Sequence, residues 1–272
     1  MSADIAACKA ALAHLDLDDN PKTVKQKSRD FFWYSPTLKA RLDDVTADFV
    51  VAPKSEAEVI EAVRAAFAHD VPVTTRGAGT GNYGQAMPLA GGMVLHMKHM
   101  AAVTEVAPGR VRAEAGAIMA DVDRECRARS GQELRLHPST VNTASIGGFI
   151  AGGSGGVGSI RWGGLRDAGN ILSLRLVTCE AEPRVLTLTG DDIHKANHAY
   201  GVNGIITEVE VPLAPAYDWV DVLVGFEDWG ACNRYADRMA NQDAILLKEL
   251  ATVAAPVGHD YFLRHRKHLR RE

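Results

Sequence analysis

The sequence predicts an α+β protein that presents two glycine-rich segments on a framework of short strands and helices. Apolar, β-branched runs of strand length alternate with helix-forming stretches up to residue 215. Glycine is concentrated in a first glycine loop (residues 74–84) and in a second glycine segment (residues 137–158). Each glycine inside a helix or strand costs about 1 kcal/mol relative to alanine, so this density needs an offsetting gain. We expect that gain to be close approach of the backbone to a large, flat or extended ligand.

Length and composition are typical of a globular protein and give no sign of a nucleic-acid or membrane role. The chain has 272 residues, of which 46% are hydrophobic and 24% charged, and its formal net charge is -4. No apolar run is long enough to span a membrane, and no signal peptide is evident. The four cysteines lack metal-type spacing, which fits a reducing compartment. We therefore expect a cytoplasmic protein with no membrane span, no metal site and no nucleic-acid partner.

The first predicted unit is strand, helix, strand, glycine loop and strand. Residues 49–53 form a strand that ends at a proline, and Ser55 caps the following helix with Glu58 at the capping-box position. Residues 70–73 and 93–95 are the strands on either side of the first glycine loop. The helix is expected to bury an apolar stripe made of Val59, Ile60, Val63, Ala66 and Phe67.

The first glycine loop is the clearest candidate for a binding site in this unit. Its alternate glycines leave little side-chain bulk, so successive backbone N–H groups can turn into one concavity that binds an anion. Diphosphate is the usual guest of such a nest. From this stretch alone, a glycine-rich hairpin loop without a chemical role remains the alternative.

The second predicted unit carries the second glycine segment. Its expected elements are a hairpin at residues 103–115, a helix at 119–128, strands at 171–178 and 185–189, and a long strand that ends near residue 211. Together the two units predict an α+β pair with two glycine-rich surfaces that face one ligand from opposite sides.

After about residue 215 the pattern changes, and a second domain is expected. The spacing predicts strands at residues 219–226 and 244–250 with a helix at 229–240 between them. The basic run at residues 264–271 indicates a solvated helix face, with a nucleic-acid or membrane tail as the alternative. This part of the chain is too small to bury a core alone.

The chain contains three motifs in order: RGAGTGNYGQAMP from residue 76, HPSTVNTASIGGFIAGGSGG from residue 137 and YGVNGIITEVEVPL from residue 200. Together they resemble the FAD-binding domain of the vanillyl-alcohol oxidase/p-cresol methylhydroxylase (PCMH-type) flavoproteins, in particular the glycolate oxidase FAD subunit and D-lactate dehydrogenase branch. The resemblance implies a PCMH-type FAD-binding fold of two α+β subdomains, followed by the start of an α/β cap domain. The implied parts are an N-terminal arm (1–42), the FAD-binding domain (43–215, with subdomains at about 43–100 and 101–215) and a partial substrate or cap domain (216–272).

The resemblance implies that the first glycine loop holds the FAD diphosphate through its amides. The second glycine segment would run beside the flavin and the phosphoribityl chain, and Gly204, Ile205 and Ile206 would offer backbone groups to the adenine. In relatives with covalent flavin a histidine usually occupies the position of Thr80, so non-covalent FAD is expected. The implied cofactor-binding residues are Arg76, Gly77, Ala78, Gly79, Thr80, Gly81, Asn82, Tyr83, Gln85, Pro138, Ser139, Thr143, Ala144, Ser145, Gly147, Gly148, Ala151, Gly152, Gly153, Gly204, Ile205 and Ile206.

The resemblance also implies an activity, that of an FAD-dependent oxidoreductase (dehydrogenase or oxidase) acting on CH–OH groups. The expected small-molecule substrate is a 2-hydroxy acid or a similar alcohol, with hydride transfer to flavin N5. In relatives the catalytic groups come mostly from the cap and the segment after it, so the catalytic residues are unknown and the chain is expected to be incomplete for catalysis. Two alternatives stay open: a non-catalytic FAD-bearing electron-relay subunit of a multisubunit dehydrogenase, and an FAD-binding fragment that lacks the catalytic cap. An electron-acceptor protein or a partner subunit is a possible partner.

Other polar residues near the motifs allow two interpretations each. His137 could face the flavin or be a satisfied loop histidine, and the second interpretation is favoured. Tyr83 and Gln85 could reach the flavin or shape the first glycine loop. Arg161 and Arg166 could meet an anionic substrate, but surface ion pairing is the simpler interpretation.

Overall fold

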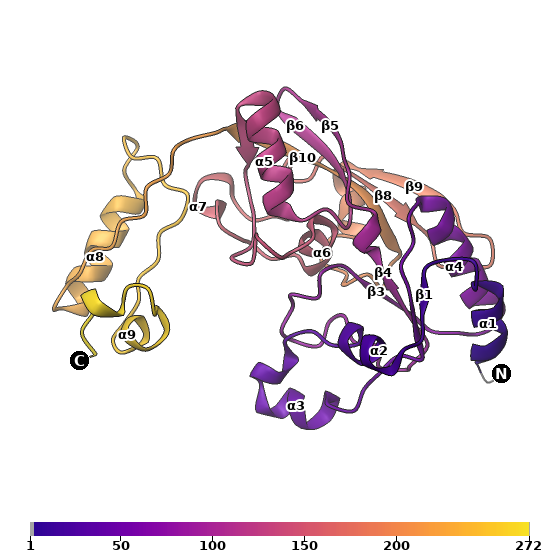
Figure 1. The fold of residues 1–272 in the computed structure, drawn as a ribbon. Coiled ribbons are helices and arrows are strands. Elements are labelled where there is room, and N and C mark those ends of the chain that lie inside the picture. Colours follow the sequence, from indigo (N-terminus) through magenta and orange to yellow (C-terminus); the bar gives the residue numbers. More distant parts are fainter. Residues whose placement is uncertain (1–2, 272) are drawn as a thin grey trace. The chain divides into compact units, whose positions relative to one another are not determined.

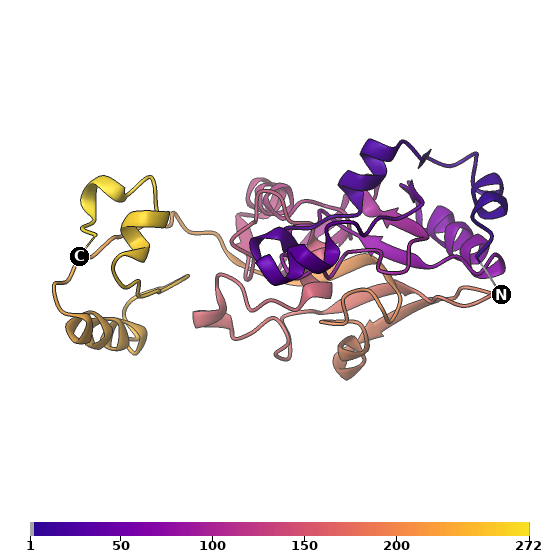
Figure 2. The ribbon, with the colours of Figure 1, turned by 90° about the horizontal axis from the view of Figure 1, so that it is seen from below.

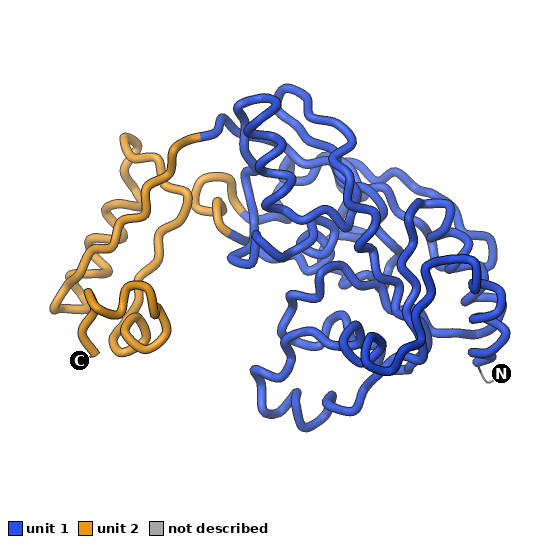
Figure 3. The backbone as a smooth tube through the Cα atoms, in the orientation of Figure 1, with its two compact units in different colours: residues 1–156, 164–216 blue, residues 157–163, 217–272 orange. Residues whose placement is uncertain are grey.

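The computed structural model describes residues 3–271, and the chain folds into two compact units. The first unit comprises the chain up to Gly156 together with Gly164–Ala216, and the second comprises Val157–Gly163 and the chain from Tyr217 onward (Figure 3). Within the described residues, no helix combines the length and the apolar character needed to pass through a bilayer. The same part of the chain contains no group of three or more His, Cys, Asp or Glu residues that could hold a metal ion.

The first unit is a mixture of helices and two β-sheets (Figure 1). Its helices are α1 (Ile5–Ala11), α2 (Pro21–Lys27), α3 (Pro36–Leu42), α4 (Glu56–Ala68), α5 (Met119–Ser130) and α6 (Ile146–Gly152), with the 3-10 turns η1 (Phe32–Tyr34), η2 (Met97–His99) and η3 (Gly190–Lys195). Its strands are β1 (Leu17–Asp18), β2 (Phe49–Val51), β3 (Val73–Arg76), β4 (Met93–His96), β5 (Val103–Ala107), β6 (Arg110–Glu114), β7 (Gln132–Leu134), β8 (Ser173–Val177), β9 (Val185–Thr189) and β10 (Ile205–Pro215).

The first sheet has the strand order β1-β2-β4-β3. β2 and β3 run parallel to β4, and α4 is the crossover from β2 to β3, so the first glycine loop leaves the carboxyl end of β3. Ser55 caps α4 as predicted, because its hydroxyl accepts the amide of Glu58 at 3.3 Å. The Glu58 carboxylate accepts the amide of Lys54 at 2.8 Å rather than that of the cap residue. α1 packs beside α4 (Figures 1 and 2).

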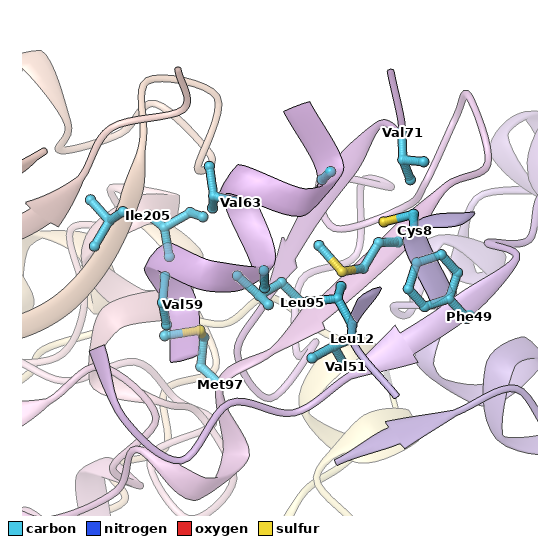
Figure 4. Close-up of a cluster of buried hydrophobic side chains, with 14 of the residues drawn as sticks. Cys8, Leu12, Phe49, Val51, Val59, Val63, Val71, Leu95, Met97 and Ile205 are labelled. Atoms are coloured by element: carbon cyan, nitrogen blue, oxygen red, sulfur yellow. The ribbon is translucent and has the colours of Figure 1, made fainter. Parts of the chain in front are cut away.

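One apolar core joins the two sheets. Val59, Val63 and Ala66 on one face of α4 are buried, and Ile205 of β10 packs into the same cluster (Figure 4). The apolar stripe predicted for this helix includes Phe67, but that side chain is 54% exposed. Phe67 lies about 80° around the helix from Val59, at the edge of the apolar face, and there it borders solvent instead of the sheet.

The second sheet has the order β5-β6-β10-β8-β9, and all of these neighbours are antiparallel. β10 is the central strand, and its carboxyl end also pairs with β7. The hairpin predicted at residues 103–115 is formed by β5 and β6, and the helix predicted at 119–128 is α5, which ends at Gly131 in the left-handed conformation (φ 64°). α6 packs against β10 and β6, which brings the second glycine segment to this sheet.

The second unit is helical where it is regular. It contains α7 (Ser159–Trp162), α8 (Trp229–Ala240), α9 (Val257–Tyr261) and the 3-10 turn η4 (Arg266–His268). α8 coincides with the predicted helix. The strands predicted at residues 219–226 and 244–250 are not formed, since these described segments have no strand partner. Alternating residues such as Val220, which is 80% exposed, become a strand only where a second strand supplies backbone hydrogen bonds.

Candidate functional site

The first unit contains a cavity of about 600 Å³ whose wall includes both glycine-rich segments. The first glycine loop follows β3, and the second glycine segment includes α6. His198, Tyr200 and Gly201 line the cavity as well, together with Gly204 and Ile206 at the start of β10. Stretches that are far apart in the sequence therefore share one cleft, whose volume is in the range of cofactor and ligand sites.

The structure brings together nearly all of the predicted cofactor-binding residues. All of them except Arg76, Thr143 and Ile205 line the cavity. Thr143 is exposed in a turn that precedes α6, and Ile205 is fully buried in the core between the two sheets. Arg76 belongs to the first glycine loop, and its side chain is buried in the protein. For Thr143 and Ile205 the motif gives the right neighbourhood, because their chain neighbours Ala144, Gly204 and Ile206 line the cavity.

Several cavity residues are not predicted from the sequence. They are Asp30, Thr75, Ala86, Met97, Ala115, Thr140, Phe149, Ser154, His198, Tyr200 and Gly201. Tyr200 and Gly201 do open the third motif, which is a signal that could have found them. His198 and Tyr200 have φ values of 59° and 52°, which are uncommon for residues other than glycine, and the His198 Nε2 lies 2.9 Å from the Tyr200 hydroxyl. Nothing in the sequence near Asp30 connects it to the glycine segments.

Four consecutive amides of the first glycine loop have no hydrogen-bond partner among the described residues. They belong to residues 79–82. The neighbouring amides are occupied, because Ala78 donates to Ser145 Oγ at 3.3 Å and Tyr83 donates to Gln85 Oε1 at 2.8 Å. Backbone N–H groups at a cavity wall without a protein partner are the donors that an anion needs. The loop therefore fits a diphosphate group.

Several glycines in this wall allow parts of the protein itself to touch. A Cβ on Gly77 would lie 2.1 Å from Ser145 Oγ, and a Cβ on Gly147 would lie 2.6 Å from the Cβ of Ala115. Gly152 differs, because a Cβ there would meet no atom within 4 Å. Most of the glycine density in the wall is thus explained by contacts inside the protein, and only Gly152, among the glycines that line the cavity, leaves open space.

We predict that Gly77→Ala loosens the contact between the two glycine-rich segments. The added methyl group overlaps Ser145 Oγ, and overpacking of this kind costs about 1–3 kcal/mol of unfolding free energy. In Gly77→Ala/Ser145→Ala the hydroxyl is gone and the nearest remaining atom is the Cβ at 3.3 Å, so most of the loss should be recovered. Urea denaturation of the four proteins measures this coupling as a double-mutant cycle, and strictly additive losses would show that the segments do not touch in solution.

The buried guanidinium of Arg76, at the start of the first glycine loop, lies against Gly79 of the same loop. Arg76 is 6% exposed, and a Cβ on Gly79 would be 2.1 Å from its Nη2. Its Nη1 donates to Arg29 O at 2.6 Å and its Nη2 to Ala78 O at 3.4 Å, whereas Nε has no partner among the described residues. Burial lowers the pKa of Arg76, and the Asp30 carboxylate opposes this shift. The guanidinium thus holds a positive charge against the loop from inside the protein.

Two more buried titratable groups lie close to Arg76. His96 is opposite Arg76 in the pairing of β3 with β4, and burial, together with the positive charges of Lys27 and Arg76, lowers its pKa to about 3. His96 is therefore neutral at physiological pH. Asp30 lines the cavity, and burial raises its pKa even though its carboxylate accepts the amide of Gly84. A carboxylate repels an anion, so its presence in the wall of an anion site indicates a structural role.

The remaining candidates from the sequence lie away from the cavity or shape its wall. His137 does not line the cavity, and its Nδ1 lies 3.0 Å from Pro138 O, as in the loop-histidine interpretation. Tyr83 and Gln85 both line the cavity, and Gln85 holds the loop through the amide of Tyr83. Arg161 belongs to the second unit, where its guanidinium stacks on the Trp162 ring at 5.2 Å.

Residues 47–187 match the family model described as an FAD binding domain. This match covers more than half of the chain, so the chain belongs to that family of FAD-binding domains. The fold is the PCMH-type FAD-binding fold and the cofactor is FAD, consistent with the unpartnered amides of residues that line the cavity.

Known proteins of this kind resemble the chain over nearly two thirds of its length. It is 30% identical over 180 residues to the glycolate oxidase subunit GlcD of Bacillus subtilis, covering 62% of this chain and 37% of that protein. It is 31% identical over 184 residues to the D-lactate dehydrogenase of Archaeoglobus fulgidus, covering 64% and 40%. A structure of alkyldihydroxyacetonephosphate synthase superposes with a TM-score of 0.65 at 22% identity, covering 75% of this chain and 39% of that one. The chain thus spans about two fifths of the length of the relatives it matches.

Proposed function

We propose that this chain is the FAD-binding part of an oxidoreductase that acts on a CH–OH group, with a 2-hydroxy acid or a similar alcohol as substrate. The observation that carries the proposal is the cavity shared by the two glycine-rich segments, with four unpartnered amides in its wall. The substrate class is supported by the names of the relatives, a glycolate oxidase subunit and a D-lactate dehydrogenase. Bound FAD would supply the redox chemistry by accepting a hydride at N5.

The chain's own residues would bind and orient the cofactor. The amides of residues 79–82 would hold the diphosphate, and the buried charge of Arg76 would favour the anion from behind the loop. Binding would be non-covalent. Thr80 lines the cavity but offers no ring nitrogen for a flavin bond. Cys126 is buried outside the cavity, and burial raises its pKa to about 12, so its reactive thiolate is not formed.

The other parts of the chain complete the proposal. Residues 43–215 would form the FAD-binding domain, residues 1–42 an N-terminal arm and residues 216–272 part of a substrate or cap domain. We assign no catalytic base within the chain. A small-molecule substrate, an electron-acceptor protein or partner subunit, and a cytoplasmic location belong to the same proposal.

The test is reduction of the FAD-loaded protein under anaerobic conditions. We expect D-lactate or glycolate to bleach the yellow flavin absorbance, as dithionite does in a parallel sample. Flavin that dithionite reduces and no 2-hydroxy acid reduces would reject the proposed reaction and favour the electron-relay alternative. Failure of the protein to take up FAD would reject both the proposed reaction and the electron-relay alternative, and would leave a fragment without a redox role. L-Lactate serves as the matched control for stereospecific binding of the substrate.

A further inference from the structure

Residues 29–31, here called the clasp, lie outside the family match and are hydrogen-bonded to the first glycine loop at several points. At the start of the loop, Arg76 Nη1 donates to Arg29 O at 2.6 Å. In its middle, Phe31 N donates to Gly81 O at 2.8 Å. The clasp therefore contacts the loop before its free amides, at Arg76, and among them, at Gly81.

Asp30 closes the clasp at the end of the loop. Its Oδ2 accepts the amide of Gly84 at 2.9 Å, while its Oδ1 accepts the amide of Phe32 at 2.8 Å. The side chain bridges the turn that follows the clasp and the last residue of the glycine loop. Asp30 is 5% exposed, so these bonds are formed where water cannot easily replace them.

The clasp is itself fixed to the body of the first unit. The Ser28 hydroxyl, which is fully buried, donates to Val24 O at 2.7 Å and accepts the amide of Ala47 at 2.9 Å. Arg29 Nη1 donates to Asp43 O at 2.9 Å. Because the clasp is anchored to the body of the unit at Arg29 and at the preceding residue, Ser28, its bonds to the glycine loop restrain the loop and not only the clasp.

We propose that the clasp pre-forms the first glycine loop for the FAD diphosphate, with Asp30 as its main positioning residue. The loop contains several glycines, whose backbone freedom would be lost on binding an anion. Hydrogen bonds at Arg76, Gly81 and Gly84 remove much of that freedom in advance and leave the amides of residues 79–82 unpartnered. Preorganisation of this kind raises affinity by lowering the entropy lost on binding. The inference rests on FAD as the ligand of the cavity and not on the substrate.

Because Asp30 is negatively charged, the proposal and the alternative predict opposite changes in FAD affinity when Asp30 is replaced. Asp30 lines the cavity, and a carboxylate near a diphosphate repels it. If Asp30 were only a charged residue of the wall, its removal would tighten FAD binding. If it positions the loop, its removal weakens FAD binding despite the lost repulsion.

The first experiment is titration of the apo-protein with FAD, followed by quenching of flavin fluorescence. Asp30→Ala removes both acceptors, and we expect the Kd for FAD to rise about tenfold to a hundredfold, since hydrogen bonds to charged groups are worth more than neutral ones. Asp30→Asn keeps one acceptor, so its Kd should fall between those of Asp30→Ala and wild type. Asp44→Asn is the matched control, because Asp44 is exposed, lies fourteen residues after Asp30 and makes no hydrogen bond to a described residue. Its Kd should equal that of wild type.

The second experiment removes one backbone donor. Phe31→Pro lacks the N–H that binds Gly81 O, and Phe31→Ala keeps it while losing the same aromatic ring. We expect Phe31→Pro to bind FAD more weakly than Phe31→Ala. Hydrogen exchange of the apo-protein gives a readout apart from binding, because amides 79–84 should exchange faster in Phe31→Pro and in Asp30→Ala than in the two controls.

The outcomes distinguish failure of the clasp proposal from failure of the proposed function. Tighter or unchanged FAD binding in Asp30→Ala, together with unchanged hydrogen exchange of amides 79–84, would overturn the proposal that the clasp pre-forms the loop. Weaker binding with faster exchange would support it, whether or not a 2-hydroxy acid reduces the flavin. Should Asp30→Ala not fold, the comparison of Phe31→Pro with Phe31→Ala decides, and equal Kd values would overturn the proposal. Exchange measured on wild-type apo-protein remains decisive even if no FAD is taken up, because a pre-formed loop must be protected at residue 84.

Discussion

Replacing Gly152 by valine should weaken FAD binding strongly while leaving the protein folded. Gly152 lines the cavity at the end of α6, and a Cβ there meets no protein atom within 4 Å, so the new side chain enters open space beside the cavity. The two γ-methyl groups then occupy volume that the cofactor needs. We expect the Kd for FAD to rise about a hundredfold or more, which is about 2.7 kcal/mol of binding free energy. The helix itself should gain slightly, because valine is a better helix former than glycine.

Fluorescence titration with FAD and thermal unfolding of the apo-protein check both parts of this expectation. Gly155→Val is the matched control, since a Cβ on Gly155 also meets no atom within 4 Å and Gly155 does not line the cavity. Its affinity for FAD should stay close to that of wild type. Normal FAD binding by Gly152→Val would contradict the assignment of this cavity to the cofactor.

Acidification should destabilise the apo-protein through His96. The pKa of His96 is lowered from 6.5 to about 3, first by burial and then by the nearby cations, so the folded state holds this imidazole neutral. In the unfolded chain the same imidazole takes up a proton once the pH falls below about 6.5, which favours unfolding. The contribution of His96 is therefore lost as the pH falls. Between about pH 6.5 and pH 5 it should lower the unfolding free energy by about 2 kcal/mol, and the loss should continue toward about pH 3.

Urea denaturation of wild type and His96→Gln at several pH values isolates this effect from other titrating groups. The glutamine keeps a polar side chain of similar length but does not titrate, so the variant should lose about 2 kcal/mol less than wild type on going to pH 5. His194→Gln, at an exposed histidine, should follow the wild-type pH dependence. Equal slopes in wild type and His96→Gln would show that the imidazole is not held neutral in the folded state.

The elements with local signals were predicted well. The Ser55 cap and the apolar spacing of α4 depend on residues within a few turns of one another, and the structure has both. Strand β3 is less well predicted, because it covers Val73–Arg76 whereas the pattern indicated residues 70–73. Asp70 has a φ of 54° after the end of α4, a left-handed conformation that no strand contains and that its sequence neighbours do not announce.

The site was predicted as two segments but not as a complete wall. Glycine density marks both segments, because glycine is costly in regular structure and its concentration needs a reason. The sequence around Asp30 has no comparable signal. It reaches the cavity only because the N-terminal arm folds back onto the first glycine loop. The paired His198 and Tyr200 are likewise placed by contacts of their backbone amides with the carbonyls of Ile150 and Ala151.

The amino-acid sequence by itself determined which segments are glycine-rich, that Ser55 caps α4, and that the motifs belong to an FAD-binding domain. Those features depend on interactions over a few residues, or on motif order. The tertiary structure alone decided that Asp30 and Arg76 hold the first glycine loop, that Gly77 serves a contact with Ser145, and that residues 219–226 form no strand. Each of these depends on which distant group supplies the hydrogen-bond partner or fills the neighbouring space, and that partner is fixed only when the chain has folded.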